Sequence, residues 1–256
     1  MKNILNNIEF HYTYLIMLVG LVLTGHFVNV FIFTSLILIH EMGHAFASLL
    51  FKYKVEKIII YPYGGITKVN KLVNTRIWKD ILVAISGVLF QTIYFFIIYI
   101  FTKNGLVREY VYNLFLTYHK SMLIFNLLPI IPLDGSKIIN LILSKYLNFN
   151  MANNLTVLIS LIAIVIFLFS DIYENNYSIV MTLGVLFQNI YKFYKEISFV
   201  YNKFLLERYL YNFNYSKVKV IKDRNKMYKN CHHLFIKNGK MMDEKRYLNN
   251  IFGKKA

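Results

Sequence analysis

Long runs without charged residues constrain this chain more than any other feature of its sequence. Residues 14–23, 81–101 and 155–169 contain no Lys, Arg, Asp or Glu. The longest of these runs reaches the roughly 20 residues that span the hydrocarbon core of a bilayer. With 57% hydrophobic and 16% charged residues, the chain is too apolar for an ordinary soluble domain. The sequence therefore predicts an integral membrane protein.

Six apolar segments predict an all-α polytopic membrane protein with about six transmembrane helices. We expect a multi-pass transmembrane domain at residues 1–195 and a small, basic α/β extension in the cytoplasm at residues 196–256. The start of the chain has no small-residue cleavage site after its apolar run, so this run is predicted to be a retained helix rather than a signal peptide. The six segments cover residues 10–25, 30–51, 78–101, 110–128, 153–170 and 177–193.

The formal net charge of +16 lies in the segments between apolar runs and in the C-terminal region. A basic chain can bind nucleic acid, but a membrane explanation is simpler, and we expect no direct nucleic-acid partner. The loop at residues 52–79 and the C-terminal extension are rich in Lys and Arg. Because cytoplasmic loops carry an excess of these residues, both termini are predicted to lie in the cytoplasm.

The second apolar segment contains the sequence HEMGH, which is typical of a metal-dependent hydrolase. On a helix, His40 and His44 share a face and can bind one metal ion, while Glu41 beside them can take a proton from water. An acidic or basic side chain near the middle of a membrane costs at least roughly 2.5 to 3.5 kcal/mol. The alternative, that both histidines only bond neighbouring helices, leaves three costly residues with this spacing unexplained.

A catalytic zinc site takes three protein ligands, so a third ligand is expected elsewhere. The segment NLLPIIPLDG at residues 126–135 offers Asp134, because Pro129 and Pro132 interrupt a helix just before it. Alternatively, this segment is an ordinary loop with an Asp-Gly turn. One Zn²⁺ ion is the default, although such a site accepts several divalent ions. Of the other candidate ligands, His11 and His26 are predicted to lie at the membrane interface, and His119 lies in the polar interruption of the fourth segment. The cluster in the extension is predicted to be structural: Cys231, His232 and His233.

Two segments outside the helices are predicted to form β-structure. Residues 58–70 are rich in Ile, Tyr and Val around Gly64 and Gly65, which favours a hairpin or re-entrant loop. An exposed strand edge there would hold an extended substrate through backbone hydrogen bonds, whereas the alternative is a plain basic loop. In the extension we expect strands at residues 217–221 and 233–236, a turn at residues 238–239 and a helix from about residue 243.

Taken together, these motifs resemble the site-2 protease family of intramembrane metalloproteases (peptidase M50), and most closely its sporulation branch in endospore-forming bacteria. The resemblance covers about the first 190 residues. Val88 departs from the family pattern, which commonly has proline there. The matching residues are His40, Glu41, His44, Pro62 to Gly65, Ser86, Gly87, Asn126, Pro129, Pro132, Asp134 and Gly135.

The resemblance implies a zinc site of His40, His44 and Asp134, with Glu41 as general base and acid in peptide hydrolysis. Asn126 and Pro132 would shape the site and position the substrate. The implied substrate is a sporulation sigma-factor precursor of the pro-sigma-K type, cleaved in the mother-cell membrane around the forespore. Implied partners are inhibitory membrane proteins, ATP at a truncated CBS-like extension, and a second copy in a homo-oligomer.

Two other functions are open from the sequence. A general site-2 protease would cleave a membrane-bound anti-sigma factor or remnant signal peptides. A metal-binding scaffold or transporter would use the histidines and Asp134 as a transit site, but transporters more often show inverted repeats, and none is visible in the sequence. Glu41 within HExxH favours the protease.

Overall fold

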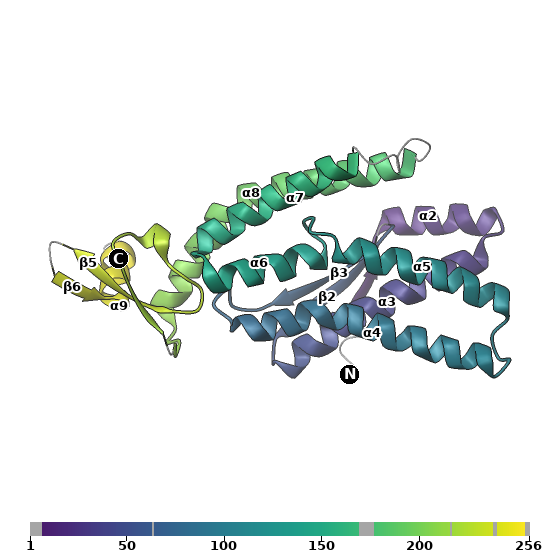
Figure 1. Ribbon diagram of the computed structural model, residues 1–256, viewed down its shortest axis with the longest axis horizontal. Helices are drawn as coiled ribbons and strands as arrows, with labels where there is room; N and C mark the ends of the chain where they lie inside the picture. The colour runs from purple at the N-terminus through teal and green to yellow at the C-terminus, as the bar shows by residue number, and fades with distance from the viewer. Residues whose placement is uncertain (1–6, 63, 169–176, 216, 238–239, 254–256) are drawn as a thin grey trace. The chain divides into compact units, whose positions relative to one another are not determined.

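The computed structural model describes residues 7–62, 64–168, 177–215, 217–237 and 240–253 (Figure 1). The chain forms two compact units. The first contains residues 1–71 and 82–127, and the second contains residues 72–81 and 128–256. The predicted division at residue 195 stays a prediction.

The helices of the first unit fall where the apolar segments predict them. They are α2 (Tyr12–Leu23), α3 (Phe27–Leu50), most of α4 (Ile77–Lys103) and α5 (Glu109–Leu127). In the described part of the chain, α3, α4 and α7 (Phe149–Leu168) are long and apolar enough to cross a membrane, while α2 is apolar but shorter. These helices support a membrane location, and the number of six spans stays a prediction.

A three-stranded sheet packs on α3 in the first unit (Figure 1). Its strands are β1 (Ile8–Phe10), β2 (Lys54–Tyr61) and β3 (Gly64–Asn70), in that order. The antiparallel pairing of β2 with β3 is the hairpin that the sequence predicted, and Gly64 follows its turn at a φ of 146°, which favours glycine. Ile58 and Ile60 are fully buried in a core that includes Ile37 of α3, so the hairpin is fixed against the helix.

The second unit contains α6 (Asp134–Tyr146), which the sequence analysis did not predict, and α7 beside α8 (Tyr177–Leu210). The proline-rich segment before α6 has an Ile131–Pro132 cis peptide bond. Ser160 of α7 supplies the partners that this irregular backbone lacks, since its hydroxyl lies 3.2 Å from the Ile131 nitrogen and 3.1 Å from the Pro129 carbonyl oxygen. Ile130 and Ile131 of this irregular segment are 1% and 5% exposed, so its backbone is covered by protein.

The C-terminal residues form a small α/β layer at the end of α8. Its described elements are β4 (Val218–Ile221), η2 (Arg224–Lys226), β5 (His232–Lys237), β6 (Lys240–Asp243) and α9 (Glu244–Phe252). Two strands and the helix fall close to the predicted positions, and β6 was not predicted. The expected turn at residues 238–239 lies outside the described residues.

The hydrophobic core of this layer extends beyond the extension itself. Phe149, at the start of α7, stacks on Phe204 of α8 with ring centroids 4.5 Å apart. Phe235 of β5 and Leu248 of α9 are fully buried in the same cluster. About sixty residues form only a marginal core alone, so the layer depends on apolar residues contributed by α7 and α8.

A buried arginine joins the extension to the segment before α4. Arg208 donates to Asn74 Oδ1 at 2.8 Å and to Glu244 Oε1 at 3.0 Å, and both ion-pair side chains are at most 5% exposed. Breaking a buried ion pair of this kind costs about 3 to 5 kcal/mol. The same guanidinium also donates to the backbone carbonyls of Tyr228, Lys229 and Cys231.

The pair of His233 and Glu244 makes this network sensitive to acid. Burial lowers the pKa of His233 from its ordinary 6.5, and the hydrogen bond to Glu244 only partly offsets that. Burial alone would raise the pKa of Glu244, but its hydrogen bond to His233 and the Arg208 guanidinium outweigh burial and hold the pKa below 4.5. The lowered pKa of Glu244 stabilises the fold at neutral pH, and this stabilisation is lost as the pH falls below 4.5. The lowered pKa of His233 leaves stability unchanged above pH 6.5 and reduces it as acid protonates this residue in the unfolded chain.

We predict that β4, β5 and α9 lose stability as the pH falls below about 6.5, and lose it more steeply below about 4.5. Hydrogen exchange of the full-length protein, corrected for the intrinsic pH dependence of exchange, measures this as falling protection of residues 217–253. Glu244→Gln should have lower protection at pH 7 and a flatter response below pH 4.5. Protection in the parent protein that is unchanged from pH 7 to pH 4 would contradict the prediction.

Candidate metal centre

Helix α3 buries three ionisable side chains one turn apart. His40, Glu41 and His44 are 2%, 5% and 6% exposed, and their ligand atoms lie within 4.8 Å of one another. His40 lies about 20 Å from the start of the helix at 1.5 Å per residue, near its middle. The HExxH spacing therefore gathers these groups at one place, as the sequence predicted.

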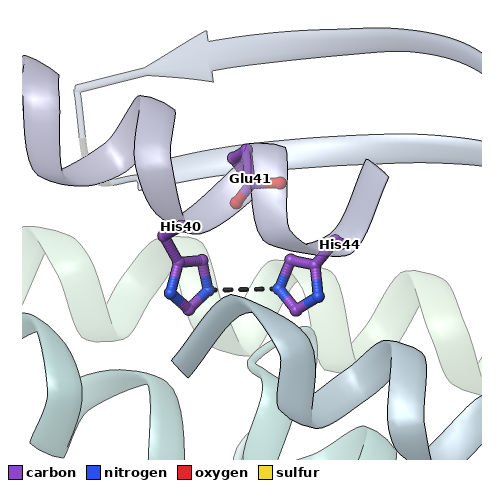
Figure 2. A group of neighbouring side chains, drawn as sticks. All are labelled: His40, Glu41 and His44. Atoms are coloured by element: carbon purple, nitrogen blue, oxygen red, sulfur yellow. Dashed lines mark hydrogen bonds between the residues drawn. The ribbon is translucent and has the colours of Figure 1, made fainter. Parts of the chain in front are cut away.

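The two imidazole rings point toward each other (Figure 2). Their Nε2 atoms are 3.1 Å apart. Each Nδ1 lies near an oxygen acceptor on α4: His40 Nδ1 is 3.2 Å from Gln91 Oε1, and His44 Nδ1 is 2.7 Å from the Val83 carbonyl. An oxygen acceptor at Nδ1 assigns the proton to that nitrogen. Both Nε2 atoms then present lone pairs to the same point.

This geometry fits a metal ion. Two lone pairs at 3.1 Å repel each other, and a cation between them removes the repulsion. Two Zn–N bonds of about 2.05 Å at a tetrahedral angle would place the nitrogens about 3.3 Å apart, close to the observed separation. Pairing of the other ring nitrogen with an oxygen is also the usual arrangement for histidine ligands. His40 and His44 are thus suited to hold zinc.

Glycine on α4 leaves room at the two imidazoles. A Cβ atom at Gly87 would lie 2.4 Å from His44 Nε2 and 2.8 Å from His40 Nε2. Small residues allow membrane helices to approach closely. Gly43 of α3 allows such an approach to α4, since a Cβ atom there would lie 2.5 Å from the Ser86 carbonyl oxygen. The contact between α3 and α4 and the space beside the Nε2 atoms therefore both depend on glycine.

Strand β3 holds Glu41 on the other side of α3. The Thr67 hydroxyl donates to Glu41 Oε2 at 2.6 Å. A Cβ atom at Gly65 would lie 2.3 Å from Glu41 Cγ, so only glycine lets the strand approach this side chain. In Figure 2, the Glu41 carboxylate lies on the side of the helix that faces the strands. The hairpin thus orients Glu41.

Asp134, the predicted third ligand, belongs to the second unit. It is the first residue of α6, where the helix N-terminus favours a carboxylate, and it is 3% exposed. Lys137 Nζ lies 2.8 Å from its Oδ1. The side chain is therefore buried, ionic and oriented by its own helix. Its place beside the two histidines stays a prediction.

Most of the other predicted substrate-binding and ligand candidates lie at the ends of helices or in the extension, whereas His119 lies inside α5. Asn126 is near the end of α5, and Pro132 precedes α6. His11 caps α2 and His26 precedes α3. Of the adjacent pair in β5, His233 is buried and the side chain of His232 is 36% exposed.

The motifs in the sequence did not identify three residues that contribute to this site: Thr67, Gly87 and Gln91. Gly87 entered only as a residue that matches the family pattern. Gln91 follows it by four residues, so both lie on one face of a helix. A buried amide in an apolar helix, in register with that glycine, is the signal that could have identified it.

The chain is similar in sequence to known proteins. Residues 28–106 match the model of peptidase family M50. The chain is 29% identical over 192 residues to stage IV sporulation protein FB of Bacillus subtilis, covering 73% of this chain and 66% of that protein. It is 27% identical over 192 residues to a zinc metalloprotease of Methanocaldococcus jannaschii, covering 70% of this chain and 56% of that protein.

A solved structure extends the comparison to the fold. The site-2 protease from Methanocaldococcus jannaschii superposes with a TM-score of 0.58 at 21% identity, covering 73% of this chain and 90% of that one. The resemblance to site-2 proteases that the motifs predicted is therefore confirmed. The chain spans slightly less than two thirds of the length of the first curated relative that it matches.

We predict that Gly87→Ala weakens zinc binding roughly 10- to 100-fold, because the added methyl group displaces both imidazoles and overpacking of this kind costs about 1 to 3 kcal/mol. Competition with a zinc chelator in detergent measures the affinity. Gly20→Ala is the matched control, since a Cβ there meets no atom within 4 Å. Equal zinc affinity in the parent and Gly87→Ala would show that the Nε2 atoms do not bind the metal.

Proposed function

We propose that this chain, which resembles peptidase family M50 over α3 and α4, is an intramembrane zinc metalloprotease that hydrolyses a peptide bond in or next to the bilayer. The observation that carries the proposal is the buried group of His40, Glu41 and His44 on a helix long enough to cross a membrane. Ionisable residues at that depth are rare and mark functional sites.

The proposed ligands of one zinc ion are His40, His44 and Asp134. Bound zinc would polarise the scissile carbonyl group and make water a stronger nucleophile near neutral pH. The two imidazoles are already aligned by acceptors at their Nδ1 atoms. Asp134 would supply a carboxylate oxygen, and its burial and its position at the start of α6 support this role.

Glu41 is the proposed general base and acid. Its carboxylate would take a proton from the attacking water and deliver it to the leaving amine, which completes hydrolysis without a net change at the residue. The hydrogen bond from Thr67 restricts one carboxylate oxygen. A metal transit site has no need for an oriented base beside its ligands, so this contact supports hydrolysis over transport.

The substrate is proposed to bind as an extended strand beside β3. This strand pairs with β2 on one side, and no described strand pairs with its other side. An open edge holds a peptide through backbone hydrogen bonds with little demand on sequence. Gly64 and Gly65 lie at the start of this edge, and Gly65 is next to Glu41. Asn126 and Pro132 are proposed to contact the same substrate.

A sigma-factor precursor of the pro-sigma-K type is the proposed substrate, and the similarity to a stage IV sporulation protein supports it. The location would then be the mother-cell membrane around the forespore, with both termini in the cytoplasm. Proposed partners are inhibitory membrane proteins, ATP at the extension and a second copy of the chain. The alternative substrates are an anti-sigma factor or signal-peptide remnants. The similarity to a zinc metalloprotease of Methanocaldococcus jannaschii supports the reaction class and fits these substrates as well as the precursor.

We predict that the parent protein cleaves a co-produced sigma-factor precursor and that Glu41→Gln reduces cleavage by at least about 100-fold, the usual contribution of a general base. Gel analysis of precursor and product measures this, with Glu9→Gln, an exposed carboxylate paired with Lys57, as the control. Cleavage by Glu41→Gln at the parent rate would refute the mechanism. Cleavage by neither would refute this substrate, and anti-sigma factors would be tested next.

The third ligand has its own test. We predict that Asp134→Ala lowers zinc affinity by at least 10-fold, because a carboxylate ligand is lost. Chelator competition on purified protein measures this without a substrate. Glu109→Ala is a matched control, since Glu109 is also an acidic first residue of a helix, α5, and is exposed. Unchanged zinc affinity in Asp134→Ala would remove Asp134 from the ligand set.

A further inference from the structure

Gln91 is a fully buried amide inside an otherwise apolar stretch of α4. Burial of an amide without hydrogen bonds costs roughly 1 to 3 kcal/mol in proteins. Gln91 avoids this cost by contacting two other helices of the first unit. Its Oε1 lies 3.2 Å from His40 Nδ1 on α3, and its Nε2 lies 3.0 Å from the His119 carbonyl oxygen on α5.

The contact with α5 determines which way the amide points. A backbone carbonyl only accepts hydrogen bonds, so the group of Gln91 that faces the His119 carbonyl must be the NH₂ group. His119 Nδ1, at 3.3 Å from the same nitrogen, can accept as well. The carbonyl oxygen of the amide is therefore directed at His40, and this assignment follows from the chemistry of the partners.

The partner on α5 is itself held in place. His119 is 7% exposed, and its ring stacks on Phe95 of α4 with centroids 4.9 Å apart and 17° between the planes. Phe115 of α5 lies parallel to the same ring at 6.1 Å. The His119 backbone thus lies in a packed aromatic cluster, so the carbonyl oxygen that Gln91 contacts has a fixed position.

We propose that Gln91 is a positioning residue for the metal site, which holds His40 in the tautomer with the proton on Nδ1 and turns its Nε2 toward the ion. The inference rests on the proposed zinc site. His44 receives the same support from the Val83 backbone carbonyl, which no side-chain substitution removes. Gln91 is therefore the position at which the orientation of a proposed ligand can be changed by mutation without touching the ligand itself.

The first experiment compares zinc affinity by chelator competition in Gln91→Leu, Gln91→Glu and the parent protein. Leu keeps the approximate size but accepts no hydrogen bond, and loss of such an outer partner typically weakens metal binding 10- to 100-fold. Glu retains an oxygen acceptor for His40, so Gln91→Glu should have most of the parent protein's zinc affinity. Thr92→Val is the control, because its hydroxyl bonds only the Val88 carbonyl in its own helix.

A purely structural role would give a different pattern. In that case Gln91→Leu and Thr92→Val would bind zinc as the parent does, or Gln91→Glu would be as weak as Gln91→Leu, and either result would overturn the proposal. If Gln91→Leu fails to fold, Gln91→Asn replaces it. Its amide remains polar but is one methylene too short to contact both helices, so the same loss of affinity is expected, and parent-like affinity overturns the proposal.

Two further readouts separate this inference from the proposed function. In protein loaded with Co²⁺, Gln91→Leu should shift the visible absorption bands, which report ligand geometry, while Thr92→Val should not. With saturating zinc and a cleavable substrate, Gln91→Leu should lower kcat and leave KM unchanged. Weaker zinc binding in a protein that cleaves no tested substrate would support the role of Gln91 and count against the proposed protease.

Discussion

The structure around α3 depends on one constraint: three ionisable side chains must be accommodated inside an apolar helix. The hydrocarbon part of a bilayer supplies no hydrogen-bond partners for such groups. The neighbouring elements supply them instead. Gln91 and the Val83 carbonyl contact the two histidines, and Thr67 contacts Glu41. Glycines at positions where a Cβ atom would collide with these side chains allow the elements to approach. Helix α4 and the hairpin thus provide the hydrogen-bond partners and the space that the ionisable side chains of α3 need.

The need of buried polar groups for hydrogen-bond partners also explains how the irregular segment before α6 is held. Prolines remove helical hydrogen bonds from this part of the chain, and Ser160 of α7 provides replacements for the Pro129 carbonyl and the Ile131 nitrogen. Asp134 follows directly as the first residue of a helix. At the extension, Arg208 donates hydrogen bonds to acceptor atoms of five residues. Buried polar groups therefore determine the arrangement within each unit.

The sequence predicted the parts of this fold that have a strong local signal. The apolar runs indicated α2, α3, α4, α5, α7 and the first half of α8. Helix α6 was not predicted because it follows two prolines, and β6 was not predicted because it has only four residues. The HExxH motif located the candidate metal centre, since its spacing alone brings the side chains together. Thr67 could not be found in this way, and Gln91 only through its register with Gly87, because their contacts with α3 arise from packing between elements distant in sequence. Their roles depend on tertiary structure rather than on a local pattern.

The central claim is that His40 and His44 bind zinc through Nε2, with a carboxylate as a further ligand. X-ray absorption at the zinc edge of the purified, detergent-solubilised protein tests it most directly. The account predicts one zinc ion per chain, with scattering from two imidazoles and only nitrogen or oxygen neighbours at about 2.0 to 2.2 Å. It also predicts that this signal disappears in a His40→Ala, His44→Ala double variant. Protein without bound zinc, or zinc with sulfur neighbours or no imidazole signal, would contradict it.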